Sequence, residues 1–291
     1  MIIKVLSIVF PVFALAGIGY LYGRYKRPNM TQINQLNMNI FVPALVFVAL
    51  ASKSFDLALY RDLALAGTVV IIGSGILAWP FIYLLKVDYK TFIPPMMFNN
   101  SGNMGLPLAL LAFGEQAVPI AVILFIIEMV LHFTLGIYMI DHRFNLLRLL
   151  RMPMIMATIL GLAVGSLSLS LWQPLMVMIK MLADVAIPLL LFSLGVRLVD
   201  ISYKDWHLGV AAAIISPATG LLIVWLISLV FKLPPLQQSM LIIFAALPPA
   251  VLNYLVAEQY NQEPEKVASI VMLANLGSLI VMPFALAVAL S

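Results

Sequence analysis

The sequence predicts an all-α integral membrane protein with ten transmembrane helices, arranged as two inverted repeats of five helices. Three observations predict this fold: the apolar composition, a series of hydrophobic stretches of membrane-spanning length, and a pattern of prolines and glycines that recurs half-way along the chain. Hydrophobic residues make up 64% and charged residues 10% of the 291 residues, and the mean hydropathy is +1.10. A water-soluble core cannot bury this much apolar surface, so the solvent must be a lipid bilayer.

The predicted spans are stretches of about 20 apolar residues, which is the length that crosses the hydrocarbon core of a bilayer. In chain order, spans 1 to 10 fall at residues 2–23, 33–51, 63–85, 91–112, 116–140, 153–170, 174–198, 207–231, 236–257 and 266–290. The alternating pattern of β-barrel strands is absent, so each span is expected to be a helix that satisfies its own backbone groups.

The two halves of the chain repeat each other. Pro11, Gly19 and Gly23 recur 142 residues later as Pro153, Gly161 and Gly165, and Pro43 and Phe47 recur 145 residues later as Pro188 and Phe192. With five spans in each half, the second copy enters the bilayer from the opposite side, which is typical of secondary transporters. The predicted repeats are residues 1–141 and 153–291.

The basic residues predict the orientation of the chain. Eleven of the 16 Lys and Arg residues fall in the connections that follow odd-numbered spans: Arg24, Lys26, Arg27, Lys86, Lys90, Arg143, Arg148, Arg151, Arg197, Lys204 and Lys266. Cytoplasmic loops carry such an excess, so these connections are expected in the cytoplasm and both termini outside it. The first span lacks a small-residue cleavage site and is expected to be a retained helix in the inner or plasma membrane.

Two spans at corresponding positions of the halves are expected to be broken. Span 4 contains Asn99, Asn100, Ser101, Gly102, Asn103, Gly105 and Pro107, and span 9 contains Pro248, Pro249 and Asn253. Glycine lowers helix propensity, and proline removes a donor and clashes with the carbonyl four residues earlier, so Pro248 and Pro249 free the carbonyls of Phe244 and Ala245. Broken helices at matching positions of inverted repeats indicate a transport site.

A site at two crossing broken helices suits a small carboxylate. The N-termini of half-helices carry unpaired N–H groups and partial positive charge. The residues expected to bind the substrate are Asn99, Asn100, Ser101, Asn103, Pro107, Pro248, Pro249 and Asn253. The alternative is that these residues only pack a kinked helix.

The sequence at these breaks also resembles a known family. Asn-Asn-Ser-Gly-Asn-Met-Gly-Leu-Pro-Leu at 99–108, Ile-Phe-Val-Pro-Ala-Leu-Val-Phe at 40–47, Ile-Pro-Leu-Leu-Leu-Phe-Ser-Leu-Gly at 187–195 and Ala-Leu-Pro-Pro-Ala at 246–250 are similar to bacterial members of the auxin efflux carrier family. The resemblance implies a ten-helix fold shared with bile-acid sodium symporters. Spans 1, 2, 6 and 7 would form a scaffold, and spans 3–5 and 8–10 a mobile core with elevator-type alternating access. It implies a small organic anion, such as malate, malonate or an auxin-like acid, held where spans 4 and 9 cross.

Four ionisable residues within or beside the spans are candidates for coupling to H⁺ or Na⁺, because such residues are costly in a membrane. Glu128 and His132 are one helical turn apart in span 5 and could be a proton carrier or a charge-neutralised structural pair. Asp184, near the centre of span 7, could bind an ion or make a polar contact with the core. Glu258, which matches Glu115 at an offset of 143, is expected at the membrane interface.

Other functions are less well supported by the sequence. An intramembrane aspartyl enzyme needs two carboxylates in one site, and Asp184 and Glu128 belong to different predicted units, so no enzyme is expected. The histidines at 132, 142 and 207 are far apart and there is no phosphate-binding motif, so no metal, cofactor or ATP is expected. The +4 charge reflects the cytoplasmic loops rather than nucleic-acid binding. A channel or a non-transporting sensor remains the alternative, and the substrate, the direction, the coupling ion and a homodimer stay open.

Overall fold

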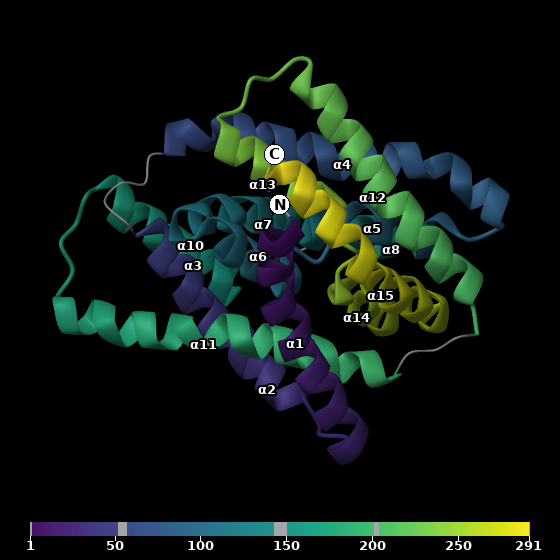
Figure 1. Cartoon of the computed structure of the whole chain (residues 1–291), viewed down its shortest axis with the longest axis horizontal. Coiled ribbons are helices and arrows are strands. Elements are labelled where there is room, and N and C mark those ends of the chain that lie inside the picture. The colour runs from purple at the N-terminus through teal and green to yellow at the C-terminus, as the bar shows by residue number, and fades with distance from the viewer. Residues whose placement is uncertain (1, 52–56, 143–149, 201–203, 291) are drawn as a thin grey trace.

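The computed structural model describes residues 2–51, 57–142, 150–200 and 204–290, and helices make up the regular structure of these residues apart from one isolated β-bridge (Figure 1). Arg143 and Arg148, two of the basic residues used to predict the orientation, lie outside the described residues. Each predicted span overlaps one or more helices, and seven of the helical segments are long enough to cross a bilayer.

The first half contains α-helices, short π-helices and 3-10 turns, the last two both labelled η. They are α1 (Ile2–Lys26), α2 (Thr31–Leu36), η1 (Asn37–Phe41), α3 (Val42–Leu50), η2 (Leu57–Tyr60), α4 (Arg61–Leu85), α5 (Tyr89–Met97), η3 (Ser101–Gly105), α6 (Leu106–Phe113), η4 (Glu115–Ala117), α7 (Val118–Leu131), η5 (His132–Gly136) and α8 (Ile137–Asp141). The second half contains α10 (Pro153–Ser166), α11 (Gln173–Arg197), η6 (Leu198–Asp200), α12 (Trp206–Ser228), α13 (Pro235–Ala246), α14 (Val251–Gln259) and α15 (Pro264–Ala289).

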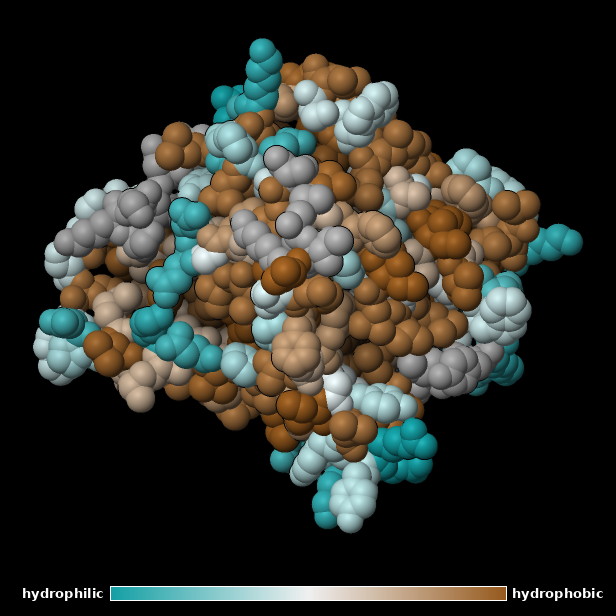
Figure 2. Space-filling model, viewed as in Figure 1, coloured by the Kyte–Doolittle hydropathy of each residue, from teal (hydrophilic) through white to brown (hydrophobic). Residues whose placement is uncertain are grey.

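The helices have the length and surface of membrane spans. Among the described residues, seven helical segments are long and apolar enough to cross a bilayer, and three shorter apolar helices cover Ser101–Phe113, Pro153–Ser166 and Pro235–Ala246. Hydrophobic residues cover most of the face seen in Figure 2, and large apolar side chains such as Phe10, Ile280 and Phe284 are about 70% exposed. A soluble protein rarely exposes apolar surface on this scale, so the chain is a multi-pass membrane protein.

One group of helices is built around α1, α3, α10 and α11. α1 packs against α11, and Figure 1 shows the two helices crossing. α3 packs on α10 and α11. The backbones of α1 and α11 touch at two glycines. A Cβ atom on Gly19 would lie 2.1 Å from the carbonyl oxygen of Phe192, and one on Gly195 would lie 1.8 Å from that of Ala16. Only glycine allows this approach, as at other close helix crossings in membranes.

A second group is built around α4, α12, α13 and α15. α12 packs on α4, α13 and α15, and α5 packs on α4. Here too a glycine permits close contact, because a Cβ on Gly220 of α12 would lie 2.2 Å from the carbonyl oxygen of Ala245 on α13. The groups meet where α1 contacts α6 and α15, α3 contacts α7, and α11 contacts η3.

Two interrupted helices cross inside the second group. The helical path breaks between α5 and η3 at Phe98–Asn100, and between α13 and α14 at Leu247–Ala250. The two breaks run antiparallel and pair as a short bridge between Asn99 and Pro249. The N–H of Asn100 donates to the carbonyl of Pro248 at 2.7 Å, and the N–H of Ala250 donates to that of Phe98 at 2.9 Å. Buried backbone groups that lost their helical partners are thus satisfied across the crossing.

The break in span 4 lies earlier than Pro107 suggested. Pro107 lies in α6, which continues directly from η3, so it stands within the helix Ser101–Phe113 and not at the break. The residues just before it form the π-helix η3, whose wider turn accommodates the ring without ending the helix. Pro94 and Pro95, inside α5, are a further source of irregularity in this span.

Candidate functional site

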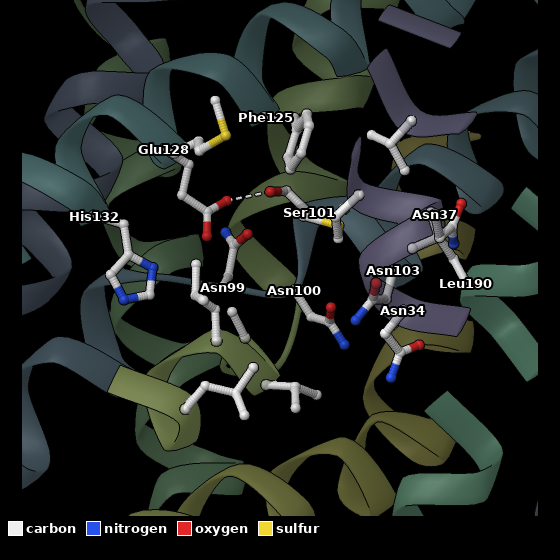
Figure 3. A pocket seen from close by; sticks show the side chains of 18 of the residues that line it. Asn34, Asn37, Asn99, Asn100, Ser101, Asn103, Phe125, Glu128, His132 and Leu190 are labelled. Carbon is white, nitrogen blue, oxygen red and sulfur yellow. Dashed lines mark hydrogen bonds between the residues drawn. The ribbon is translucent and has the colours of Figure 1, made fainter. Parts of the chain in front are cut away.

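A cavity of about 180 Å³ lies directly at the helix crossing. Its floor consists of the first turns of the two half-helices, η3 and α14, which begin at Ser101 and Val251. Its walls come from α7 and η5 on one side and from η1 and α11 on the other. Figure 3 shows the amides of Asn34, Asn99, Asn100 and Asn103 gathered around one space. The cavity therefore lies between the two groups of helices described above.

A second, larger space continues from this cavity. It has a volume of about 580 Å³ and reaches the turn after α1 at Pro28 and Asn29. Five residues line both spaces: Asn34, Met38, Arg197, Val251 and Leu255. We call the first space the crossover cavity and the second the vestibule. Together they form a path from the chain surface beside the basic end of α1 to the two broken helices.

Asn99 and Asn253 hold the crossing together. The side-chain amide of Asn99 donates to the carbonyl of Phe244 at 2.7 Å, and that of Asn253 donates to the carbonyl of Phe98 at 2.8 Å. Phe244 is one of the residues whose carbonyl Pro248 was predicted to free. Both asparagines are buried, so each amide replaces a helical hydrogen bond in a place without competing water.

Asn100 is fixed by a third amide that the sequence analysis did not select. Its side-chain N–H donates to Oδ1 of Asn275 on α15 at 2.8 Å, and Asn275 donates in turn to the carbonyls of Pro249 and Val271. Asn275 lies in the middle of an apolar span, and it matches His132 at the same offset of 143 that relates Glu258 to Glu115. A polar residue within an apolar span, at a repeat offset from an ionisable residue, is the sequence signal that could have identified Asn275.

Several polar atoms around the crossover cavity have no hydrogen-bond partner among the described residues. Asn37 is 2% exposed and neither atom of its amide makes a hydrogen bond, and the hydroxyl of Ser193 and Oδ1 of Asn99 are likewise buried and unpaired. All three residues line the cavity. Leaving a buried polar group unsatisfied costs about 1 to 3 kcal/mol, so these positions indicate a place built for a polar ligand or water.

Glu128 and His132 line the cavity but do not pair with each other. The carboxylate of Glu128 accepts a hydrogen bond from the hydroxyl of Ser101 (Figure 3). The ring of His132 instead stacks on Phe98, with centroids 4.3 Å apart and planes 7° apart. The expected contact between these neighbours on one helix is therefore replaced by contacts to the broken span 4, because both side chains point toward it.

Comparison with known proteins was made on the whole chain. The family model described as membrane transport protein matches residues 4–145 and 142–286. The chain belongs to this family. The resemblance to auxin efflux carriers, drawn from the motifs at both breaks, is thereby confirmed.

Two relatives of this membrane transport protein extend over nearly its full length. A Rhizobium meliloti (strain 1021) protein named "Putative malonate transporter" is 27% identical over 94% of this chain and 92% of its own length. An uncharacterized transporter of Methanocaldococcus jannaschii is 25% identical over 95% of this chain and 96% of its own length. The description of the family and the names of both relatives refer to transport.

The transporter does not bring every predicted residue to the cavity. Asn99, Asn100, Ser101, Asn103, Glu128 and His132 line it, whereas Pro107, Pro248, Pro249 and Asn253 do not. Pro248 and Pro249 lie in the break of span 9, Asn253 bonds across the crossing, and Pro107 lies within α6. Asp184 is 63% exposed and lies 3.4 Å from Lys180, and Glu258 is exposed and accepts a hydrogen bond from Tyr254. Neither carboxylate is near the crossing in this transporter.

The wall opposite the half-helices was missed by the sequence analysis. It is formed by Asn34 and Asn37 near the start of span 2 and by Ser193 and Arg197 near the end of span 7. Asn37 in a hydrophobic stretch was a usable signal, but Arg197 resembled an ordinary residue of a basic cytoplasmic loop. Among the described residues of the transporter, no group of three His, Cys, Asp or Glu side chains is placed to hold a metal ion.

Proposed function

We propose that the protein is a secondary active transporter that moves a small organic anion, a carboxylate, and binds it in the crossover cavity. The observation that carries this proposal is the composition of the cavity. Two helix N-termini, at Ser101 and Val251, face a buried amide and a buried hydroxyl, of Asn37 and Ser193, that have no partner in the described part of the chain.

The two half-helices supply the attraction for an anion. The first N–H groups of a helix have no intrahelical acceptor, and the helix dipole places partial positive charge at that end. Oxyanions therefore bind at such N-termini. Because these backbone N–H groups carry no formal charge, they can bind a carboxylate reversibly. Alternating access requires such release. The name of the Rhizobium relative, which refers to malonate, agrees with this class of substrate.

The packing of the helices supports an elevator-type movement. We propose ten spans in two inverted repeats, residues 1–141 and 153–291, with both termini outside the cytoplasm of a cell inner or plasma membrane. Spans 1, 2, 6 and 7 form the scaffold, which corresponds to the group around α1 and α11. Spans 3–5 and 8–10 form the mobile core. The cavity lies between scaffold and core, so movement of the core would carry the substrate with it.

We propose Glu128 as the carrier of a coupled proton. It is the one carboxyl group that lines the crossover cavity, it is 4% exposed, and its partner Ser101 begins a half-helix of the binding site. Protonation of Glu128 would change that contact and so link the proton to the substrate. A Glu128→Gln transporter should exchange labelled for unlabelled substrate at the wild-type rate but lose accumulation driven by a pH gradient. Accumulation that persists in this variant would exclude Glu128 as the carrier.

Ligand-induced stabilisation tests the proposed binding site. A ligand that binds the native state raises the unfolding temperature by mass action. In detergent, a small carboxylate should stabilise the wild-type protein and the Gln116→Ala control, whose amide is exposed and distant, but not Asn103→Ala. No stabilisation of wild type by any carboxylate would contradict the anion proposal. Equal stabilisation of Asn103→Ala would move the site away from the crossing.

A further inference from the structure

Arg197 lies at the junction of the crossover cavity and the vestibule. It is the last residue of α11, its side chain is half-buried, and it lines both spaces. A solute that moves from the vestibule into the crossover cavity therefore passes between spaces that both contact this side chain. The position was selected by neither the motifs nor the repeat pattern of the sequence.

The charge of Arg197 stands out against its surroundings. Among the described residues, Arg197 is the only charged side chain that lines the vestibule and the only Lys or Arg that lines the crossover cavity. The ion pairs found among the described side chains do not include Arg197. A guanidinium group held inside a membrane protein is costly unless an anion compensates it.

The face of α11 that carries Arg197 is directed at the binding site. Leu190, Ser193 and Arg197 follow one another at helical spacing, and all three line the crossover cavity. Ser193 is 5% exposed and its hydroxyl has no partner. One helical face of span 7 therefore presents an unpaired hydroxyl and, one turn later, a guanidinium group toward a cavity whose far side is formed by two helix N-termini.

We propose that Arg197 binds one carboxylate of a dicarboxylate substrate whose other carboxylate lies at the helix crossing, and that it thereby selects dicarboxylates over monocarboxylates. This inference rests on the proposed function as a carboxylate transporter. The guanidinium group of arginine presents parallel N–H donors that match both oxygens of a carboxylate, which the point charge of lysine does not. Two separate sets of donors along one path fit a substrate with an anionic group at each end.

Paired substrates of equal chain length test the inference. Binding of malonate and propionate, and of succinate and butyrate, would be measured calorimetrically on wild type, Arg197→Gln, Arg197→Lys and Arg151→Gln. Arg151 is an exposed arginine of the same predicted cytoplasmic face and lines neither space, so it is the matched control. Unfolding temperatures without ligand would verify that each variant is folded. If Arg197→Gln does not fold, Arg197→Lys replaces it in the comparison of dicarboxylates with monocarboxylates.

Arg197→Gln should weaken dicarboxylate binding about tenfold or more, which corresponds to about 1.4 kcal/mol, and change monocarboxylate binding less than about twofold. Arg197→Lys should restore part of the loss, and Arg151→Gln should match wild type. An equal effect of Arg197→Gln on both classes, or no effect on either, would overturn the role of Arg197 while carboxylate binding stands. A wild-type protein that binds no carboxylate would instead overturn the proposed function on which the inference rests.

Discussion

Asn99 and Asn253 form a reciprocal pair across the helix crossing. Asn99 precedes the half-helix of span 4 and donates to a carbonyl of span 9, Phe244, while Asn253 lies in the half-helix of span 9 and donates to a carbonyl of span 4, Phe98. Each broken helix is thus completed by an asparagine of the other. The pair explains how two interrupted helices can lie inside a membrane, where unsatisfied backbone groups are costly.

This reciprocity separates structural amides from ligand-binding ones. Asn253→Ala and Asn99→Ala should each lower the free energy of unfolding by about 1 kcal/mol, the usual contribution of one hydrogen bond. Asn103→Ala should leave stability without ligand unchanged, because its amide lines the cavity and has no hydrogen bond to any described residue. Thermal unfolding in detergent measures all three. Equal losses for the three variants would contradict the distinction.

The close crossing of α1 and α11 gives a second prediction, with an internal control. Gly19→Ala and Gly195→Ala place a methyl group 2.1 Å and 1.8 Å from carbonyl oxygens of the facing helix, so both should separate the helices and reduce folded protein strongly. Gly17→Ala meets no atom within 4 Å and should be neutral or stabilising, since alanine is favoured over glycine in helices by about 1 kcal/mol. The yield of monodisperse protein after size-exclusion chromatography measures this, and tolerance of all three changes would contradict the packing.

Glu263, just before α15, predicts how stability depends on pH. Partial burial raises the pKa of this carboxyl, but hydrogen bonds from Lys266 and Thr91 outweigh the burial, and the pKa lies below its usual value. The ionised form therefore stabilises the folded state above the unfolded pKa, and this contribution is lost as the pH falls through the folded pKa. Glu263→Gln should be less stable than wild type at pH 7.

The difference between the Glu263→Gln variant and wild type should shrink as the pH falls below the 4.5 reference value of the carboxyl and should disappear once the pH is below the lowered folded-state pKa. Unfolding temperatures recorded from pH 7 to pH 3 follow it. The control change is Asp88→Asn at the start of α5, on the same predicted cytoplasmic side. Among the described residues, the side chain of Asp88 accepts a hydrogen bond only from the backbone N–H of Lys90. A constant difference between Glu263→Gln and wild type at all pH values would show that ionisation of Glu263 is not responsible.

Movement of the core past the scaffold predicts sensitivity to cross-linking. The ammonium group of Lys180 on α11 lies 3.7 Å from the carboxylate of Glu115 on η4, so this ion pair joins the proposed scaffold to the proposed core. The chain has no cysteine, and paired cysteines at 115 and 180 can be joined by a short thiol reagent. Joining them should abolish transport, and reduction should restore it.

The control pair for this cross-link lies within one helix. Lys180 also lies 3.4 Å from Asp184 on the same helix, and cysteines at 180 and 184 join two points that do not move relative to each other. Their reaction with the same reagent should leave transport intact. Full transport by the protein joined between 115 and 180 would rule out the elevator-type movement.

The sequence predicted the features of the fold that depend on residues close together in the chain. Apolar stretches predicted the seven helical segments of membrane-spanning length, because the length needed to cross a bilayer leaves few alternatives. Pro248 and Pro249 predicted the second break and a freed carbonyl at Phe244, which accepts the Asn99 amide. For Glu128, helical spacing predicted His132 as the neighbour, but the hydrogen bond is made by Ser101, 27 residues away in sequence. Local periodicity cannot show which distant segment packs against a helical face.

The scaffold side of the cavity shows the same limit. Asn37 and Ser193 line the cavity because η1 and α11 face the crossing. Ser193 stands in one of the motifs that carry the family resemblance, but the motif does not show that its hydroxyl faces Asn100 or Ser101. Arg197 was counted among the basic residues of the cytoplasmic loops. The charge pattern therefore did not indicate that its side chain lines the crossover cavity and the vestibule. The unpaired state of buried polar atoms is a property of three-dimensional packing, so it can be recognised only in the structure.

Counterflow in liposomes tests the central claim most directly. Purified wild-type protein, reconstituted into vesicles loaded with an unlabelled small dicarboxylate, should take up the labelled form in a saturable way, and Asn103→Ala should take up little although it remains folded. Uptake that does not saturate would identify a channel. Binding without any uptake would identify a sensor, and either result would contradict a carrier that holds a carboxylate between its crossed helices.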